Sequence, residues 1–411
     1  MKIFSTLEPA TRRNLLVLFA TGLLFWSSLA ALLPTLPLYI RDVGGTKYQV
    51  GVVIGAFAVG LLLFRPWLGR LADRRGRRIV LLLGLAAVAI APLGYLMTQS
   101  IPLLIAIRAF HGLSIAAFTT AYSTLVVDLS PPSNRGEVIG YMSLVNPIGV
   151  AVGPAMGGFV QAWLGYTPLF LLSAGLGFAG LVSGLWIQAP MLIGPMMADT
   201  TKGAFWRLLF SPRLRTPTLA MLLVGLAFGV LSTFVPLFIQ EAGVNLNAGL
   251  FYTAAAVAGF SVRLLTGRAS DRYGRGRFIT LGLLLYALTM LLLWSAHSVT
   301  AFLLAGLLEG AGTGIFLPLI VALVADRSEA HERGRVFSLC VGGFDLGIAI
   351  AGPALGFFAE YIGYRGIFGL ASGLAFLSVL VFITQCNKTL PHSLEFALGD
   401  GSDQYALPQG D

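Results

Sequence analysis

Twelve long apolar segments separated by short polar stretches dominate the chain. A helix that crosses a lipid bilayer needs about 20 mostly apolar residues. Residues 15–40 are too long for a secretory signal and a second span follows at once, so we interpret them as the first span. The pattern predicts an all-α polytopic membrane protein whose twelve transmembrane helices lie at about 15–40, 47–68, 79–98, 101–127, 136–163, 167–188, 216–240, 248–268, 278–297, 300–325, 336–362 and 367–385.

The composition excludes a cytosolic enzyme, an intrinsically disordered chain and a secreted disulfide scaffold. Of the 411 residues, 56% are hydrophobic and only 11% are charged, whereas a soluble protein carries about a quarter charged residues. The two cysteines, Cys340 and Cys386, provide neither a disulfide framework nor a zinc-ligand spacing. The sequence shows no nucleotide-binding loop, metal cluster or nucleophile constellation, so we expect no enzyme activity, no cofactor and no bound metal.

The basic residues predict the orientation of the spans. If the N-terminus is cytoplasmic, 21 of the 27 lysines and arginines fall in cytoplasmic segments and only 3 on the opposite side. Basic residues concentrate in the cytoplasmic loops of membrane proteins. We therefore expect an integral protein of the cytoplasmic (inner or plasma) membrane with both termini in the cytoplasm. Topology also explains the net charge of +9, so nucleic acid is not an expected partner.

The two halves of the chain repeat one design. The segment from Arg65 to Arg77 returns 198 residues later, from Arg263 to Arg275. The same offset relates Asp128 to Asp326, Gly149 to Gly347, and Gly165-Tyr166 to Gly363-Tyr364. Parallel repeats of this kind build several secondary transporters, whose substrate path lies between the halves. We predict an N-terminal six-helix bundle at 1–188, a cytoplasmic linker at 189–214, a C-terminal six-helix bundle at 215–386 and a disordered cytoplasmic tail at 387–411.

The segment between spans 2 and 3 carries a recognisable signature. It matches the Gly-x-x-x-Asp-Arg-x-Gly-Arg-Arg pattern of the major facilitator superfamily, which the chain resembles over nearly its whole length. The resemblance implies two pseudo-symmetric six-helix bundles and a conformational latch at this segment, where glycines permit tight turns. The alternative is a basic loop that only sets topology. The implied latch residues are Gly69, Asp73, Arg74, Gly76 and Arg77, with Asp271, Arg272, Gly274 and Arg275 as their counterparts.

Two further segments resemble motifs of the same family. Span 4 reads Leu104-x-x-x-Arg108-x-x-His111-Gly112, with His111 where the family has glutamine. In proton-coupled relatives this arginine is implicated in proton transfer; alternatively, Arg108 orders the helices by binding backbone carbonyls. Span 5 resembles the antiporter motif of the drug:proton antiporter branch, and glycines at this spacing also let helices pack closely. The residues of that motif are Gly149, Gly153, Pro154, Gly157 and Gly158.

Four ionisable residues lie deep inside the predicted spans: Arg108, His111, Glu309 and Asp345. Such residues indicate function by default, because burying a charge in a bilayer costs free energy. Glu309 is our leading proton carrier, since a carboxylate partly removed from water can bind and release protons near neutral pH. Glu309 and Asp345 have an alternative role as structural partners of neighbouring groups. Span 1 has no acidic residue, so coupling would depend on the C-terminal half.

Aromatic side chains are the remaining candidates for a substrate cavity. A stripe of aromatic residues is more often packing or lipid-facing than substrate-binding, and the central spans lack a sugar-type cluster of Asn, Gln and Trp. This composition favours an amphipathic or apolar substrate. The candidates are Phe25, Trp26, Phe228, Phe234, Phe302 and Phe316.

The sequence therefore predicts a secondary active transporter that works by alternating access. We expect a monomer that exports a small, amphipathic molecule in exchange for protons, with the substrate, protons and the lipid bilayer as its partners. The alternatives are a proton symporter or a facilitator for a small metabolite, which would act in uptake. A receptor built on a transporter scaffold would need a long sensory domain, and none is visible.

Overall fold

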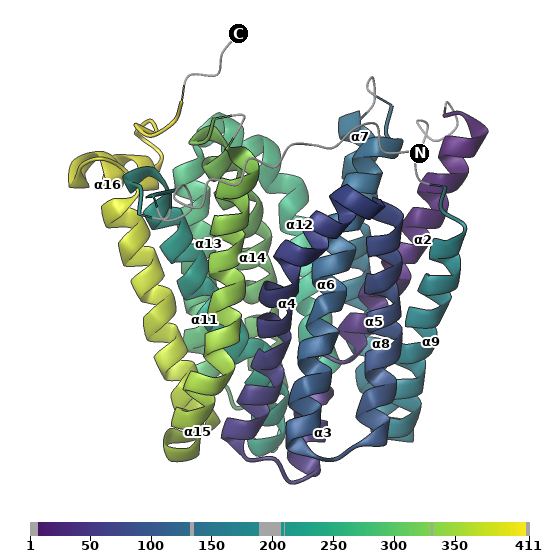
Figure 1. The fold of residues 1–411 in the computed structure, drawn as a ribbon. Helices are drawn as coiled ribbons and strands as arrows, with labels where there is room; N and C mark the ends of the chain where they lie inside the picture. Colours follow the sequence, from purple (N-terminus) through teal and green to yellow (C-terminus); the bar gives the residue numbers. More distant parts are fainter. Residues whose placement is uncertain (1–6, 132–134, 189–206, 209, 330–331, 408–411) are drawn as a thin grey trace. The chain divides into compact units, whose positions relative to one another are not determined.

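The computed structural model describes residues 7–131, 135–188, 207–208, 210–329 and 332–407. Every regular element in these ranges is a helix (Figure 1). The chain divides into two compact units. Unit 1 comprises Met1–Ala198 and Asn247–Thr253, and unit 2 comprises Asp199–Leu246 and Ala254–Asp411. The bounds predicted for the bundles and the linker stay a prediction, because most of 189–214 lies outside the described residues.

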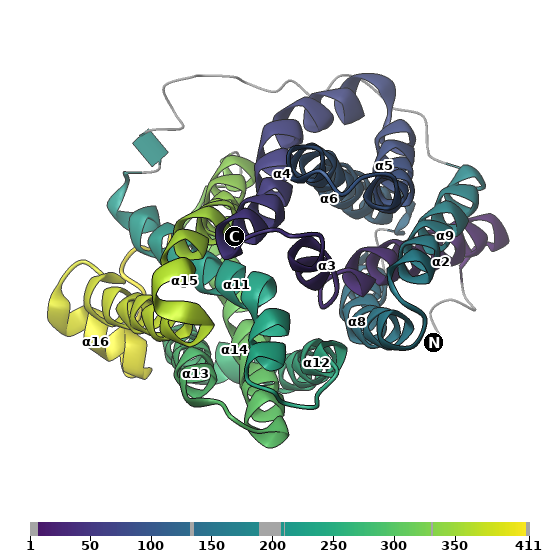
Figure 2. The same cartoon turned by 90° about the horizontal axis from the view of Figure 1, so that it is seen from below.

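Unit 1 contains the first six predicted spans. Spans 1 and 5 are each broken into two helices, span 1 at Leu32–Thr35 and span 5 at Ser143–Leu144. Within the unit, α6 packs between α4 and α5, as Figure 2 shows, while α2 packs on α8 and α9. The helices are α2 (Pro9–Ala31), α3 (Leu36–Asp42), α4 (Lys47–Arg75), α5 (Arg77–Met97), α6 (Ile101–Leu129), α7 (Arg135–Met142), α8 (Val145–Leu164) and α9 (Tyr166–Leu185).

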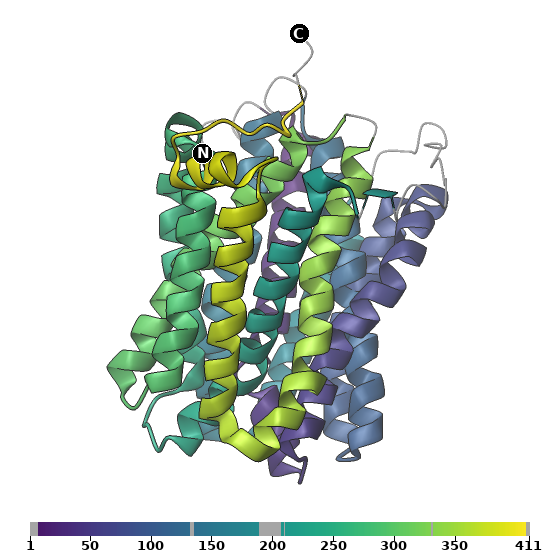
Figure 3. The same ribbon diagram turned by 90° about the vertical axis from the view of Figure 1, so that its left-hand side faces the viewer.

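Unit 2 contains the remaining spans in five long helices and a short one, except that the start of α12, up to Thr253, belongs to unit 1. The helix α15 is two spans joined at Gly363, whose φ of 70° lies in the left-handed region that favours glycine. Figure 3 shows α11 beside the two arms of α15. With α15 counted as two, the described residues contain the twelve predicted spans. The helices are α11 (Pro212–Glu241), α12 (Ala248–Tyr273), α13 (Arg275–Ser295), α14 (Val299–Asp326), α15 (Arg333–Gln385) and α16 (Leu390–Leu398).

Local sequence signals set several helix ends. Thr46 begins α4 with a capping box, in which its hydroxyl accepts a bond from the Gln49 amide at 3.2 Å and the Gln49 side chain accepts one from the Thr46 amide at 3.0 Å. The Ser298 hydroxyl caps α14 by accepting a bond from the Ala301 amide. Single glycines with positive φ separate α4 from α5 and α12 from α13, at Gly76 and Gly274.

Two expectations about loops and tail were wrong. Gly69 does not form a turn, because α4 continues as a helix to Arg75 and the connection to α5 is the single residue Gly76. The tail after span 12 is not disordered over its described length. Residues Leu390–Leu398 form α16, and Asp403 forms an ion pair with the buried Arg327.

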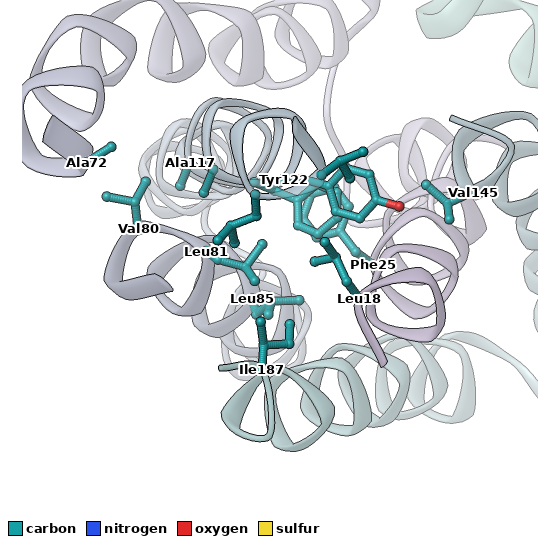
Figure 4. Close-up of a cluster of buried hydrophobic side chains, with 14 of the residues drawn as sticks. Leu18, Phe25, Ala72, Val80, Leu81, Leu85, Ala117, Tyr122, Val145 and Ile187 are labelled. Atoms are coloured by element: carbon teal, nitrogen blue, oxygen red, sulfur yellow. The ribbon is translucent and has the colours of Figure 1, made fainter. Parts of the chain in front are cut away.

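Apolar side chains fill the interior of unit 1. Figure 4 shows Leu18 and Phe25 of α2 facing Leu81 and Leu85 of α5, with Tyr122 of α6 alongside. The Phe25 ring stacks on Phe118 with centroids 3.8 Å apart. Packing against neighbouring helices therefore positions the ionisable residues that α6 carries.

Backbone contacts at glycines reproduce the repeat within each unit. A Cβ on Gly112 of α6 would overlap the carbonyl oxygen of Phe57 on α4. A Cβ on Gly310 of α14 would overlap the carbonyl oxygen of Ala255 on α12. Both residues of the second pair follow those of the first by 198 positions, which is the offset found in the sequence. The same helix contact has thus been kept in both halves.

We expect Gly310→Ala to destabilise the protein and Gly373→Ala to leave it unchanged. The added methyl at position 310 meets backbone that cannot move aside, and overpacking of this kind costs about 1–3 kcal/mol. At Gly373, also in a helix, no atom beyond its chain neighbours and the local helix backbone lies within 4 Å of the added carbon. Thermal unfolding of the two purified variants measures the difference, and equal midpoints would contradict the packing argument.

Candidate functional site

An ion pair at corresponding positions joins two helices in each unit. In unit 1, Arg77 at the start of α5 pairs with Asp128 at the end of α6. In unit 2, Arg275 at the start of α13 pairs with Asp326 at the end of α14. All four side chains are about one quarter exposed (25–28%). The repeat landmarks Asp128 and Asp326, which had no assigned role, are thus the partners of two predicted latch residues.

The other predicted latch residues lie around these pairs. Asp73 and Arg74 are exposed in the last turn of α4. Arg272 lies over the ring of Tyr273, with 5.3 Å from its guanidinium carbon to the ring centroid. The side chain of Asp271 lies outside the described residues. The ion pairs fix the helix ends within each unit, and the latch function of this segment stays a prediction.

Arg108 and His111 meet inside unit 1. They lie one turn apart on α6, and a guanidinium nitrogen of Arg108 is 3.5 Å from Nδ1 of His111. The Tyr95 hydroxyl of α5 lies 3.1 Å from the same Nδ1. On the other side, the Arg108 guanidinium carbon is 4.3 Å from the centre of the Phe57 ring of α4. Cation–π attraction of this geometry stabilises a desolvated guanidinium.

This cluster holds a buried positive charge without an ion-pair partner among the described residues of its own unit. Arg108 is 7% exposed and His111 is fully buried. Within the described part of unit 1, no carboxylate oxygen lies within 4 Å of Arg108. Nε of Arg108 and Nε2 of His111 also have no hydrogen-bond partner. A buried, incompletely satisfied cation is costly for stability, and a functional role for these two residues stays a prediction.

Glu309 lies in the interior of unit 2. It projects from the middle of α14, is 6% exposed, and forms no ion pair with any residue that the structure describes in this unit. Tyr286 of α13 is close enough to interact electrostatically with the carboxylate, and its buried hydroxyl has no hydrogen-bond partner. One turn further along α14, the Thr313 hydroxyl donates to the Glu309 backbone carbonyl at 3.0 Å.

Glu309 and His111 occupy corresponding positions of the repeat. They are separated by 198 residues, and each immediately precedes the glycine that packs on a neighbouring backbone, Gly310 or Gly112. Each also has a buried tyrosine from the preceding span beside it, Tyr286 or Tyr95. The repeat offset of 198 residues reveals in the sequence that His111 and Glu309 correspond. The two tyrosines do not follow this offset, so only the packing of the helices shows that they occupy similar places.

The other predicted residues are distributed over both units. Asp345 is buried on α15, with 8% of its surface exposed. Phe25 belongs to the core of unit 1, while Phe302 packs on Phe238 and Phe234 on Tyr364 in unit 2. Of the remaining aromatic candidates, Trp26 packs against the unit 1 core, Phe228 contacts Phe344, and Phe316 is buried on α14. Contact of these rings with substrate stays a prediction.

The glycine motif of span 5 forms a close helix contact. Gly149, Gly153 and Gly157 lie on one face of α8 against α2, where added Cβ atoms would meet Trp26, Ser27 and Ala31 respectively. Pro154 and Gly158 are buried on the same helix. The packing role of these residues follows from the contacts, and a role in antiport stays a prediction.

Comparison with known proteins agrees with this architecture. The Major Facilitator Superfamily model matches residues 18–275 and 247–397. The multidrug resistance protein MdtG of Salmonella paratyphi A is 25% identical over 383 residues, which are 90% of this chain and 94% of the relative. MdtG of Yersinia enterocolitica is 26% identical over 391 residues, covering 90% of this chain and 92% of the relative. An uncharacterized MFS-type transporter of Salmonella typhimurium is 25% identical over 91% of this chain and 97% of the relative.

Solved structures share the fold at lower identity. The nucleoside transporter NupG aligns with a TM-score of 0.79 at 13% identity, covering 90% of this chain and 99% of that chain. The human organic anion transporter MFSD10 aligns with a TM-score of 0.67 at 20% identity, covering 91% of this chain and 100% of that chain. The matched length, the twelve spans and the shared fold lead to one conclusion: the chain belongs to the Major Facilitator Superfamily and is a membrane transporter.

Proposed function

We propose that the protein exports a small amphipathic molecule across the cytoplasmic membrane in exchange for protons, by alternating access. The observation that carries the proposal is the position of Glu309, which is buried in the middle of α14 without an ion pair in the described part of unit 2. A buried carboxylate without a counter-charge is far more costly ionised than protonated. Proton binding at Glu309 therefore changes the free energy of any conformation that buries it.

Coupling of transport to protons follows from this difference in free energy between the protonated and the ionised Glu309. A ligand shifts a conformational equilibrium only by its differential affinity for the two states, and the proton acts here as such a ligand. The conformation that encloses Glu309 is favoured when the carboxylate is protonated, and a conformation that hydrates it is favoured when it is ionised. The unpartnered Tyr286 hydroxyl supplies a donor that can stabilise the ionised form as the side chain rearranges.

The N-terminal half contributes a complementary charge. Arg108 presents a buried guanidinium with a free Nε, and His111 holds its Nδ1 toward two donors. We assign both residues to proton coupling together with Glu309 and Asp345. The predicted latch, with its ion pairs Arg77–Asp128 and Arg275–Asp326, would hold the helix ends as the conformations exchange.

The relatives support export as the direction. Several are named multidrug resistance proteins and align over nearly the whole chain. The structural neighbours are described as nucleoside, organic anion and peptide transporters, so the fold alone does not define the substrate. A proton symporter or a facilitator for a metabolite is the alternative function.

Inverted membrane vesicles containing the protein test the proposal. We expect fluorescent amphipathic cations such as ethidium, screened within a broad compound panel, to accumulate when the vesicle interior is acidified. A gradient of one pH unit would drive about tenfold accumulation at one-to-one exchange. A protonophore should abolish it, and vesicles without the protein are the control. Uptake that does not depend on the pH gradient would indicate a facilitator. Accumulation only when the gradient is reversed would indicate a symporter. Either result overturns antiport.

A further inference from the structure

The short helix α16 lies across the end of unit 2 rather than along it. Only four residues, from Cys386 to Thr389, separate it from the last span, which ends at Gln385. Figure 2 shows α16 outside α13 and α15, and Figure 3 shows its yellow ribbon running across the direction of the spans. It lies at the end of unit 2 that the distribution of basic residues assigns to the cytoplasm.

The side chains of α16 form three distinct faces. Ser393, Phe396 and Ala397 are buried against unit 2. His392 and Glu395 are exposed on a polar face. The third face is a row of leucines at a spacing of four residues, which aligns them along one side of a helix. These are Leu390, Leu394 and Leu398, which are 53%, 38% and 59% exposed.

Contacts with unit 2 fix the rotation of α16 about its axis. The Phe396 carbonyl lies where a side chain on Gly276 of α13 would have to be, so the two helices touch at their backbones. The Ser393 hydroxyl accepts a bond from the Asn387 amide at 2.9 Å. Since the buried face cannot turn away from unit 2, the leucine row must face out of the bundle.

The chain beyond α16 is also bound to unit 2 by hydrogen bonds and an ion pair. Asp403 binds the fully buried Arg327 through two hydrogen bonds of 2.7 and 2.9 Å. The Asn387 side chain donates to the Ser402 carbonyl and accepts from the Gln404 amide, both at 2.9 Å. The helix is therefore anchored at both ends.

Exposed apolar and basic side chains lie at the same end of unit 2 as the leucine row. The last span exposes Leu377 and Leu380, and α13 exposes Leu281, toward the ends of these two helices that contact α16. Exposed Lys388 and Arg277 flank the two ends of α16. Basic side chains at this depth attract anionic headgroups.

We propose that α16 is a membrane-surface helix whose Leu390, Leu394 and Leu398 insert into the boundary between headgroups and acyl chains of the cytoplasmic leaflet. A helix with one apolar face lies in this boundary when the buried apolar area and nearby basic residues both favour it. The remaining polar face then points to the cytoplasm. Because Leu407 donates a backbone bond to the Asp326 carbonyl, the tail links this lipid contact to the end of α14.

Spin labelling of the full-length protein tests the proposal without any transport assay. Single cysteines replace Leu394 on the leucine row, His392 on the polar face, and Leu380 as a lipid-facing reference. All three positions are exposed, so the labels need not disturb packing. The native cysteines give little background, because both are buried and burial raises the pKa of the Cys386 thiol to about 11.

In vesicles of phosphatidylethanolamine and phosphatidylglycerol, we expect the label at position 394 to resemble the label at position 380. Both should collide with oxygen, which partitions into lipid, several times more often than with a water-soluble nickel chelate. The label at position 392 should show the opposite ratio. Equal nickel accessibility at 392 and 394 would overturn the proposal, as would dipolar broadening at 394 that reveals a second copy of the chain on this face.

Discussion

Replacing Glu309 by glutamine is expected to abolish transport driven by a pH gradient. Glutamine has nearly the size of a protonated glutamate but carries no titratable group, so the bundle should fold while the proton loses its differential effect on the conformations. The imposed gradient should then produce no accumulation in inverted vesicles. Loss of a tenfold accumulation corresponds to about 1.4 kcal/mol of coupling free energy.

A second measurement separates coupling from substrate binding. Exchange of labelled for unlabelled substrate without a gradient should persist in the Glu309→Gln variant, since it requires no net proton movement. Glu395→Gln is the matched control, because this carboxylate is exposed on the polar face of α16. Undiminished uphill export by the Glu309 variant would contradict the assignment of the proton site.

Replacing Asp403 by asparagine is expected to destabilise the end of unit 2 that carries α16. Arg327 is fully buried and loses its counter-charge, and removing one partner of a buried ion pair costs about 3–5 kcal/mol. The remaining bonds of Arg327, to the carbonyls of Arg213 and Cys386, cannot neutralise the guanidinium. Thermal unfolding should begin at a lower temperature than in the native protein.

Thiol reactivity gives an independent measure of the same change. Cys386 is buried next to the tail, and its thiol donates to the Ser393 carbonyl at 3.4 Å. In a Cys340→Ala background, release of the tail in Asp403→Asn should make Cys386 react with maleimide. Asp400→Asn changes an exposed carboxylate of the same tail. This control should neither lower the unfolding temperature nor make Cys386 reactive. An unreactive Cys386 with unchanged unfolding would show that the ion pair does not hold the tail.

The spans and their repetition could be predicted from the sequence because both are encoded locally. Apolar runs of sufficient length identify the helices, and the recurrence of Arg77 as Arg275 and Asp128 as Asp326 identifies the duplication. The ion pairs between these residues required the fold, since residues about 50 positions apart must meet across two antiparallel helices.

Other features depend on contacts that no local pattern reveals. Gly69 was expected in a turn because it belongs to the loop signature between spans 2 and 3 and glycine permits tight turns, yet the helix continues through it. The tail was expected to be disordered because its acidic residues follow no period, whereas Asp403 pairs with a buried arginine 76 residues earlier in the chain. Likewise, Tyr95 and Tyr286 gain their significance only from packing beside His111 and Glu309.

The one-residue connections at Gly76 and Gly274 have a consequence for biosynthesis. Each joins two helices through a single residue, so we expect the two members of each pair to insert into the membrane together as a helical hairpin, with the charged end of α4 or α12 left in water. A reporter protein inserted at either glycine would separate helices that insert as one. Fusions intended to follow the protein in cells should therefore avoid both glycines.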